Sequence, residues 1–196
     1  MVKVELVEDT GDEWGRNFLK KSNQGFIQPW GTWYSAGLII SEEIIDGIEA
    51  KVISMFGRES DGRNAIYQKC DGLIIDEEYT LSVYARLNDS VSVDNGYIDL
   101  YINEYIRIPI TKEWKRISIT QKAKREDEII HITMRQSYPV DIALPKLEKG
   151  STATPWTPAP EDYANYDYKN KECDIELGLT LPDESVEYVS IGKFTV

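Results

Sequence analysis

Residues 96–110 read GYIDLYINEYIRIPI, and this alternation decides the fold of the chain. Aliphatic residues take every second position on each side of a turn at Asn103-Glu104, which predicts a β-hairpin. An extended strand places alternate side chains on opposite sides of a sheet. With the aliphatic side turned to a core, one outer face carries Tyr97, Asp99, Tyr101, Tyr105 and Arg107.

The same period of two recurs along most of the chain. Runs rich in β-branched and aromatic residues are separated by polar turns at intervals of roughly 8–15 residues. They predict strands at residues 2–7, 32–40, 48–55, 65–69, 79–87, 96–102, 105–110, 114–120, 129–136, 140–147, 172–181 and 187–196. Residues 42–48 are compatible with one short helical turn. This spacing of short strands is typical of an all-β sandwich or barrel.

A proline-rich stretch divides the chain into parts. Residues 150–162 read GSTATPWTPAPED, with three prolines between Pro155 and Pro160. Proline removes backbone donors, so this stretch is predicted to be extended and to end the main domain. We expect the last two strands to pair with residues 2–7 as a small β element built from both termini. The predicted parts are an N-terminal β arm (1–12), a main domain (13–162) and a C-terminal β segment (163–196) that fits part of an adjoining domain.

Charge and composition exclude several classes of partner. A net charge of −12 repels phosphate backbones and anionic lipids, so neither a nucleic acid nor a membrane is an expected partner. No apolar run approaches the length of a membrane span. The two cysteines, Cys70 and Cys173, form neither a disulfide framework nor a metal motif. The aromatic residues are mostly Tyr and Trp (12 and 5, against 4 Phe), which suits partly polar partners as well as β-sheets.

Catalytic motifs are absent from the sequence, and we expect no enzyme activity. There is no nucleophile elbow, no phosphate-binding glycine loop and no metalloprotease motif. The single histidine, His131, lies in a predicted strand opposite the aliphatic Ile130, Ile132 and Met134, so it is expected on a sheet surface. Asp and Glu are so numerous that counting them does not exclude the carboxylate pair of a glycosidase, but nothing singles out such a pair.

Two aromatic groups are candidate ligand-binding residues. The five side chains of the hairpin's outer face combine flat rings with a carboxylate and a guanidinium. Rings stack on the apolar face of a pyranose, and charged groups hydrogen-bond sugar hydroxyls. Trp30 and Trp33 form a second candidate group at a loop edge, where one of the two is expected to anchor the core. The alternatives for the hairpin face are a solvated surface, or a surface covered by a loop or a partner subunit.

Three parts of the sequence resemble known modules. Residues 15–23 (GRNFLKKSN) resemble the opening of modules in phage tail proteins. Residues 65–68 (AIYQ), 79–86 (YTLSVYAR) and 114–116 (WKR) resemble strands of carbohydrate-binding modules of the family 4/9 kind. The most specific similarity is at residues 145–162, which include PKLEKG and ATPWTPAPED. Such a segment recurs where these modules end in minor tail, or baseplate, proteins of phages and prophages.

The resemblance, which spans roughly residues 14–162, implies a jelly-roll β-sandwich that binds glycans. Such modules often hold a structural calcium ion near the junction of the first and last strands, and Asn17 and Asp141 are the candidate ligands here. The resemblance also implies a place in the virion, on the tail. Acidic residues interrupt the apolar stretch that a signal peptide would need at residues 1–8, so we expect synthesis in the bacterial cytoplasm and release by lysis.

Three functions follow as hypotheses. The first is a non-catalytic module that attaches to a saccharide of the host cell surface during host adsorption. The second is a purely structural tail module, whose Tyr-rich face is a subunit interface. The third is an accessory domain of a longer tail enzyme that degrades the cell wall. In each case the expected partners are other tail or baseplate proteins, with an oligomeric state inside the particle.

Overall fold

The computed structural model describes residues 15–25, 28–33, 37–57, 62–136, 138–163, 172–180 and 186–195. The chain divides into two compact units, Met1–Asp162 and Tyr163–Val196. In the described part of the chain, no helix is long and apolar enough to cross a membrane. Residues 1–12, which include the strand expected at 2–7, lie outside the described residues.

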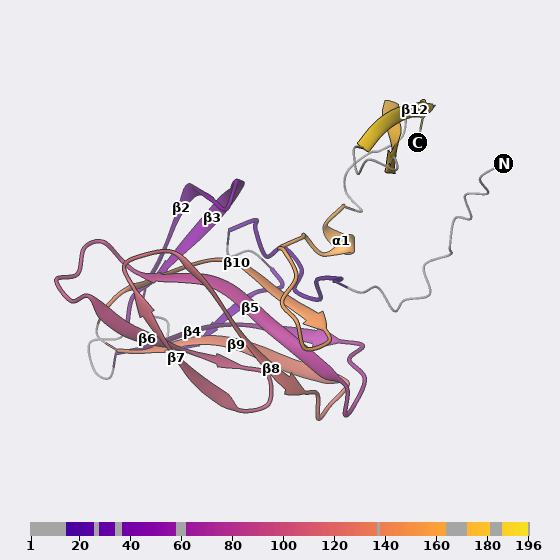
Figure 1. Ribbon diagram of the computed structural model, residues 1–196. Coiled ribbons are helices and arrows are strands. Elements are labelled where there is room, and N and C mark those ends of the chain that lie inside the picture. The colour runs from indigo at the N-terminus through magenta and orange to yellow at the C-terminus, as the bar shows by residue number, and fades with distance from the viewer. Residues whose placement is uncertain are drawn as a thin grey trace. The chain divides into compact units, whose positions relative to one another are not determined.

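The first unit is a sandwich of two five-stranded antiparallel sheets, an all-β jelly-roll fold as predicted (Figure 1). The front sheet has the order β1-β4-β9-β6-β7, made of β1 (Gly31–Trp33), β4 (Arg63–Asp71), β9 (Asp127–Arg135), β6 (Asn95–Tyr101) and β7 (Tyr105–Thr111). The back sheet has the order β2-β3-β10-β5-β8, made of β2 (Leu38–Ile45), β3 (Ile48–Met55), β10 (Val140–Lys149), β5 (Glu78–Leu87) and β8 (Lys115–Lys122).

The core lies between the two sheets and is built from alternate positions of their strands. In the front sheet, Ile98, Leu100 and Ile132 are fully buried. Leu81 and Val83 of β5 are equally buried on the inner face of the back sheet and belong to the same cluster. Ile98, Leu100, Ile102 and Ile110 of the hairpin at residues 96–110 therefore face this core, while Ile106 is 39% exposed. The tyrosines of the hairpin are left on the outer side.

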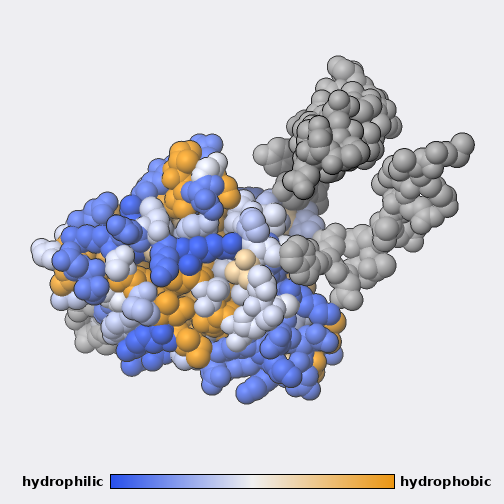
Figure 2. All heavy atoms as spheres, viewed as in Figure 1, coloured by the Kyte–Doolittle hydropathy of each residue, from blue (hydrophilic) through white to orange (hydrophobic). Residues whose placement is uncertain are grey.

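Two local predictions near β2 were wrong. The strand expected at residues 32–40 is two strands in different sheets, since β1 pairs with β4 while β2 pairs with β3. The helical turn considered for residues 42–48 is instead the β2–β3 hairpin, which turns at Asp46 and Gly47 with φ of 52° and 78°. Positive φ at both turn residues suits an Asp-Gly pair, which matches the twist of the flanking strands. Figure 2 shows apolar side chains gathered at the tip of this hairpin.

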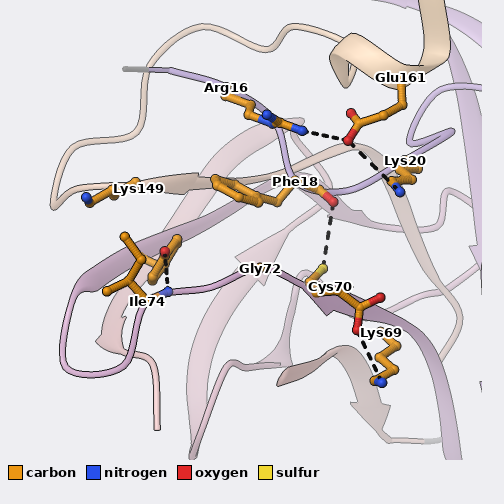
Figure 3. Close-up of a pocket in the computed structure, with 11 residues that line it drawn as sticks. Arg16, Phe18, Lys20, Lys69, Cys70, Gly72, Ile74, Lys149 and Glu161 are labelled. Carbon is orange, nitrogen blue, oxygen red and sulfur yellow. Dashed lines mark hydrogen bonds and ion pairs between the residues drawn. The ribbon is translucent and has the colours of Figure 1, made fainter. Parts of the chain in front are cut away.

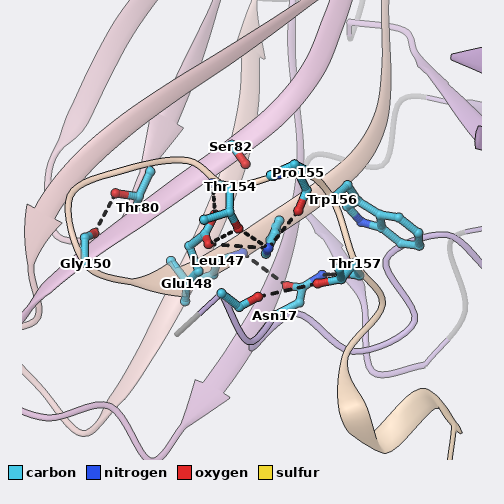
Figure 4. A network of polar contacts seen from close by, with 12 residues as sticks. Asn17, Thr80, Ser82, Leu147, Glu148, Gly150, Thr154, Pro155, Trp156 and Thr157 are labelled. Atoms are coloured by element: carbon cyan, nitrogen blue, oxygen red, sulfur yellow. Dashed lines mark hydrogen bonds and ion pairs between the residues drawn. The ribbon is translucent and has the colours of Figure 1, made fainter. Parts of the chain in front are cut away.

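The proline-rich stretch covers the outer face of the back sheet. Lys146 and Glu148 of β10 point to that face, are both 1% exposed as side chains and lie 3.4 Å apart (Nζ to Oε2). Lys146 Nζ donates to Thr154 Oγ1 at 2.6 Å and to the carbonyl of Pro155 at 2.9 Å, while Glu148 Oε1 accepts from the amide of Thr154 (Figure 4). Trp156 packs against the smaller apolar cluster on the same face. This stretch is therefore fastened to the sandwich.

The remaining elements are short. Helix α1 (Pro160–Tyr163) ends the first unit and starts the second. In the second unit, β11 (Glu172–Thr180) pairs antiparallel with β12 (Val186–Thr195). The strands expected at 172–181 and 187–196 are therefore present and form a hairpin with each other. Their expected pairing with residues 2–7 involves residues outside the described part of the chain.

Candidate functional site

A row of rings crosses the outer face of the front sheet. The strand register brings them together, because His131 of β9 lies between Tyr67 of β4 and Tyr101 of β6, and Tyr101 in turn lies opposite Tyr105 of β7. Trp33, at the end of edge strand β1, completes the row. We call these five side chains the aromatic face, and the name includes the charged group of Asp99, Arg107 and Arg135 that lies beside them.

The rings are packed against one another around the histidine. The imidazole of His131 stacks on Tyr101, with ring centroids 4.5 Å apart and an angle of 20° between the planes. Trp33 meets the same imidazole edge-on at 4.4 Å, and it also contacts Tyr67 at 4.8 Å. Trp33 is 37% exposed and Tyr105 is 41% exposed, whereas His131 is 5% exposed. The two ends of the row are therefore open to a ligand, and its centre is buried.

Glycine at position 31 makes room for the row. A Cβ atom built on Gly31 would lie 2.4 Å from the Cζ atom of Tyr67. Gly31 and Tyr67 are paired across β1 and β4, so the tyrosine ring lies directly over the glycine. Any larger residue at position 31 would push the ring of Tyr67 out of its present place.

A buried carboxylate and two arginines lie beside the rings. Arg107 donates from Nε and Nη2 to the two oxygens of Asp99 at 2.9 and 3.1 Å, and Arg135 Nε lies 3.3 Å from Asp99 Oδ2. The guanidinium of Arg107 stacks on Tyr97 at 3.8 Å, and that of Arg135 stacks on Tyr105 at 4.4 Å. The bond to Asp99 raises the pKa of Arg107 above its ordinary value. Both guanidiniums are thus held in fixed orientations.

His131 is neutral in this environment. Burial among the rings lowers its pKa from 6.5 to about 4, because the charged imidazolium loses its hydration there. Its Nδ1 atom forms a hydrogen bond with the Tyr105 hydroxyl at 3.0 Å. Within the described residues, the Nε2 atom of His131 and the neighbouring Thr133 Oγ1 are buried without a hydrogen-bond partner. The middle of the aromatic face therefore holds unused polar groups beneath its rings.

The structure places six of the seven predicted ligand-binding residues on this one face. The five residues of the hairpin lie together on β6 and β7, namely Tyr97, Asp99, Tyr101, Tyr105 and Arg107. Trp33 joins them across β4 and β9. Trp30 does not, since it is 5% exposed in the core and donates from Nε1 to the carbonyl of Lys20 at 2.9 Å. It is the tryptophan of that pair that anchors the core.

Sequence reasoning missed three residues of the face. Tyr67, His131 and Arg135 come from β4 and β9, which lie between the hairpin and Trp33. Alternation already indicated that His131 and Arg135 point outward. The missing information was the strand order, which puts β9 next to β6.

The predicted calcium ligands are fully used by the protein. The amide nitrogen of Asn17 donates to Ser22 Oγ and to the carbonyls of Pro145 and Thr157, and its oxygen accepts from two backbone amides. The carboxylate of Asp141 accepts from Ser54, Arg86 and Asn88. Within the described residues, Asn17 and Asp141 share no hydrogen bond, and no group of three His, Cys, Asp or Glu residues there could hold a metal ion. The side chains of Asn17 and Asp141 are thus engaged by protein groups, and the calcium ion expected from the resemblance stays a prediction.

A separate pocket of about 220 Å³ lies at one edge of the sandwich (Figure 3). Phe18 and Tyr79 line it and meet edge-to-face at 5.6 Å. Its basic rim is largely paired with acids, since Arg16 and Lys20 both contact Glu161, at 2.6 and 4.0 Å. The pocket also contains the thiol of Cys70, whose pKa burial raises to about 12. An inert thiol and paired charges give this pocket less binding capacity than the aromatic face.

Comparison with known proteins addresses the fold. No protein-family model matches the chain, and no curated protein matches it in sequence. Among solved structures, the carbohydrate-binding module TmCBM61 in complex with β-1,4-galactotriose matches with a TM-score of 0.54 and 14% identity, over 69% of this chain and 99% of the module. The C-terminal family 22 carbohydrate binding module of Clostridium thermocellum Xyn10B matches with a TM-score of 0.53 and 11% identity, over 71% and 97%.

A third match is to part of a larger protein. The arabinose-bound α-L-arabinofuranosidase MgGH51 matches with a TM-score of 0.53 and 13% identity, over 74% of this chain but only 28% of that enzyme. The two modules are covered almost completely, while the enzyme is covered in part. At these identities the similarity concerns the fold alone. The first unit of this chain therefore has the jelly-roll fold that is also found in carbohydrate-binding modules.

Proposed function

We propose that the aromatic face binds a glycan and that the chain is a non-catalytic attachment module. The observation that carries the proposal is the row of rings with two exposed ends, Trp33 and Tyr105, beside oriented charged groups. Flat rings offer stacking surfaces to the apolar side of a sugar, and guanidinium groups offer hydrogen bonds to its oxygens. Solved modules of the same fold include one in complex with a galactotriose, which supports this reading.

The role is binding and not chemistry. A general base needs a proton to take from a reacting group, but His131 is buried under rings and bonded to Tyr105. The carboxylate of Asp99 is 4% exposed and engaged by two arginines. These groups therefore orient the face and do not act as an acid and base pair.

We further propose that this module works on a phage tail or baseplate and attaches to saccharides of the host surface. The support is the segment at residues 145–162, which resembles the end of such modules in tail proteins. A shallow single site would bind weakly, with Kd of order 1 mM, or about 4 kcal/mol. Many copies on one particle would raise the overall avidity by orders of magnitude.

A structural module is the second candidate, in which the same face is a subunit interface. One observation favours it: Tyr105 of the aromatic face and Ile106 on the opposite side of edge strand β7 are both exposed, at 41% and 39%. An edge strand with exposed apolar side chains is suited to pairing with another chain. This candidate predicts a stable oligomer that buries the aromatic face.

A binding experiment separates the two. The parent chain and the variants Trp33→Ala and Tyr105→Ala are tested on a glycan array and on purified bacterial cell walls. Loss of one stacked ring costs about 0.5–1.5 kcal/mol, so binding falls roughly 2- to 10-fold in each variant. Tyr84→Ala is the matched control, since Tyr84 lies on the back sheet and is bonded to Asp46. No glycan signal, together with an oligomer that either variant dissociates, would instead support the structural module.

A further inference from the structure

The carboxylate of Asp99, which accepts the hydrogen bonds of the charged group, is hidden from solvent. Both oxygens of Asp99 are engaged by Arg107 and Arg135, and the side chain is 4% exposed. The two guanidiniums that cover it are 54% and 36% exposed. A ligand on the face therefore meets cations, and the compensating negative charge lies beneath them. Two positive charges and one negative charge leave this group with a net charge of +1.

The exposed edges of the two arginines carry free donors. A guanidinium has five N–H groups, and Arg107 uses two of them on Asp99, which leaves three. Arg135 contacts Asp99 through Nε, which leaves its two Nη atoms without a partner in the described part of the chain. Stacking on Tyr97 and Tyr105 holds both planes in place. The donors are thus oriented before any ligand arrives, which reduces the entropy lost on binding.

The one carboxylate in this place already has both oxygens engaged, so the remaining acceptors are neutral hydroxyls. The Tyr97 hydroxyl donates to the carbonyl of Arg135 at 2.6 Å, and the Tyr105 hydroxyl is paired with His131. A neutral sugar hydroxyl is both a donor and an acceptor, so it is best matched by a site that offers both. A carboxylate or phosphate accepts only, and it forms paired bonds with arginine. The free guanidinium donors of Arg107 and Arg135, which carry the net positive charge of this group, are therefore complementary to an anion.

We propose that the aromatic face takes an acidic saccharide, whose sugar ring stacks on the row of rings while its carboxylate or phosphate binds Arg107 and Arg135. This inference rests on the proposed glycan-binding function and names the class of glycan. The net charge of −12 does not prevent it, because the Debye length is about 8 Å at physiological ionic strength and the arginines act at contact distance.

Isothermal titration calorimetry with acidic and neutral polysaccharides tests whether the ligand is an acidic saccharide. Polygalacturonate carries a carboxylate on each sugar, β-1,4-galactan is a neutral polymer of the parent hexose with the other anomeric linkage, and a glycerol-phosphate teichoic acid supplies phosphate. The full chain is expected to bind at least one acidic polymer about tenfold more tightly than galactan, with an affinity that falls as salt rises. The two acidic polymers separate a carboxylate ligand from a phosphate ligand.

Arg135→Gln is the informative variant, because Asp99 keeps both bonds to Arg107 and the face stays folded. It should lose about tenfold in affinity for the acidic polymer, the effect of one charge-assisted hydrogen bond. Arg16→Gln is the control, since it removes the same charge from a pair with Glu161 outside the aromatic face. Equal binding of galactan and the acidic polymers, sensitive to Trp33→Ala, would overturn the acidic class and leave glycan binding intact. Binding of none of the three would overturn the inference, and a silent glycan array would extend that failure to the proposed function.

Discussion

Protonation of His131 should destabilise the fold, and the size of the effect follows from its surroundings. The imidazole is 5% exposed among Trp33, Tyr101 and Tyr105, and burial lowers its pKa from 6.5 to about 4. The unfolded chain therefore binds a proton between these two pH values and the folded chain does not. Stability rises with pH wherever the unfolded state binds more protons. The contribution of neutral His131 to the free energy of unfolding is therefore fully present above about pH 6.5 and is lost as the pH falls to about 4.

The magnitude follows from the shift. Each pKa unit corresponds to about 1.4 kcal/mol, so the depression from 6.5 to about 4 corresponds to roughly 3 kcal/mol. Typical domains have a free energy of unfolding of only about 5–15 kcal/mol. Acidification should therefore remove a substantial part of the stability through this one side chain.

Two measurements check this prediction. Proton NMR follows the imidazole directly, because His131 is the only histidine in the chain. Urea unfolding is then measured across the acidic range for the parent and for His131→Phe, which keeps a ring in the row but cannot titrate. The free energy of unfolding of the parent should fall by about 3 kcal/mol more than that of the variant over that range. An imidazole that titrates near its ordinary pKa, or equal losses in the two proteins, would refute the reasoning.

Three further predictions concern stability and reactivity. Lys146→Met should cost about 3–5 kcal/mol in urea unfolding because it leaves the buried carboxylate of Glu148 without its counter-ion, bonded only to Thr154. Adding Glu148→Gln should recover most of that loss, and equal stability of the single and double variants would contradict this reasoning. Gly31→Val should displace the ring of Tyr67 and weaken glycan binding while the domain stays folded, as checked by circular dichroism and the glycan array. With the second cysteine replaced by serine, Cys70 should react with a thiol reagent at neutral pH only after unfolding, since burial raises its pKa to about 12; rapid reaction of the folded chain would contradict this.

Most strands could be predicted from sequence because one face of each sheet packs on the apolar core. Residues 48–55 were predicted as a strand with the bounds that the structure shows for β3. The errors arose where the pattern carries no information on pairing. The apolar pattern of residues 32–40 continues across a change of sheet, so alternation alone could not divide it. Asp46-Gly47 is a hairpin signal in the sequence, and the helical turn expected at residues 42–48 did not take it into account.

The candidate face could be predicted only within one hairpin. Alternation places Tyr97, Asp99 and Tyr101 on one side of β6, because that depends on neighbours along the chain. It cannot show that Tyr67 and His131 lie beside them, since strand order depends on contacts between distant segments. Burial of Trp30 also depends on such contacts, because its indole lies in the core and bonds to Lys20.

A crystal structure of the full chain soaked with acidic cell-wall oligosaccharides tests the central claim most directly. The account predicts a sugar ring stacked on Trp33 or Tyr105 on the outer face of the front sheet, with its acidic group within hydrogen-bond distance of Arg107 or Arg135. A sugar bound elsewhere on the chain, or an aromatic face buried against a second copy and closed to sugar, would contradict it.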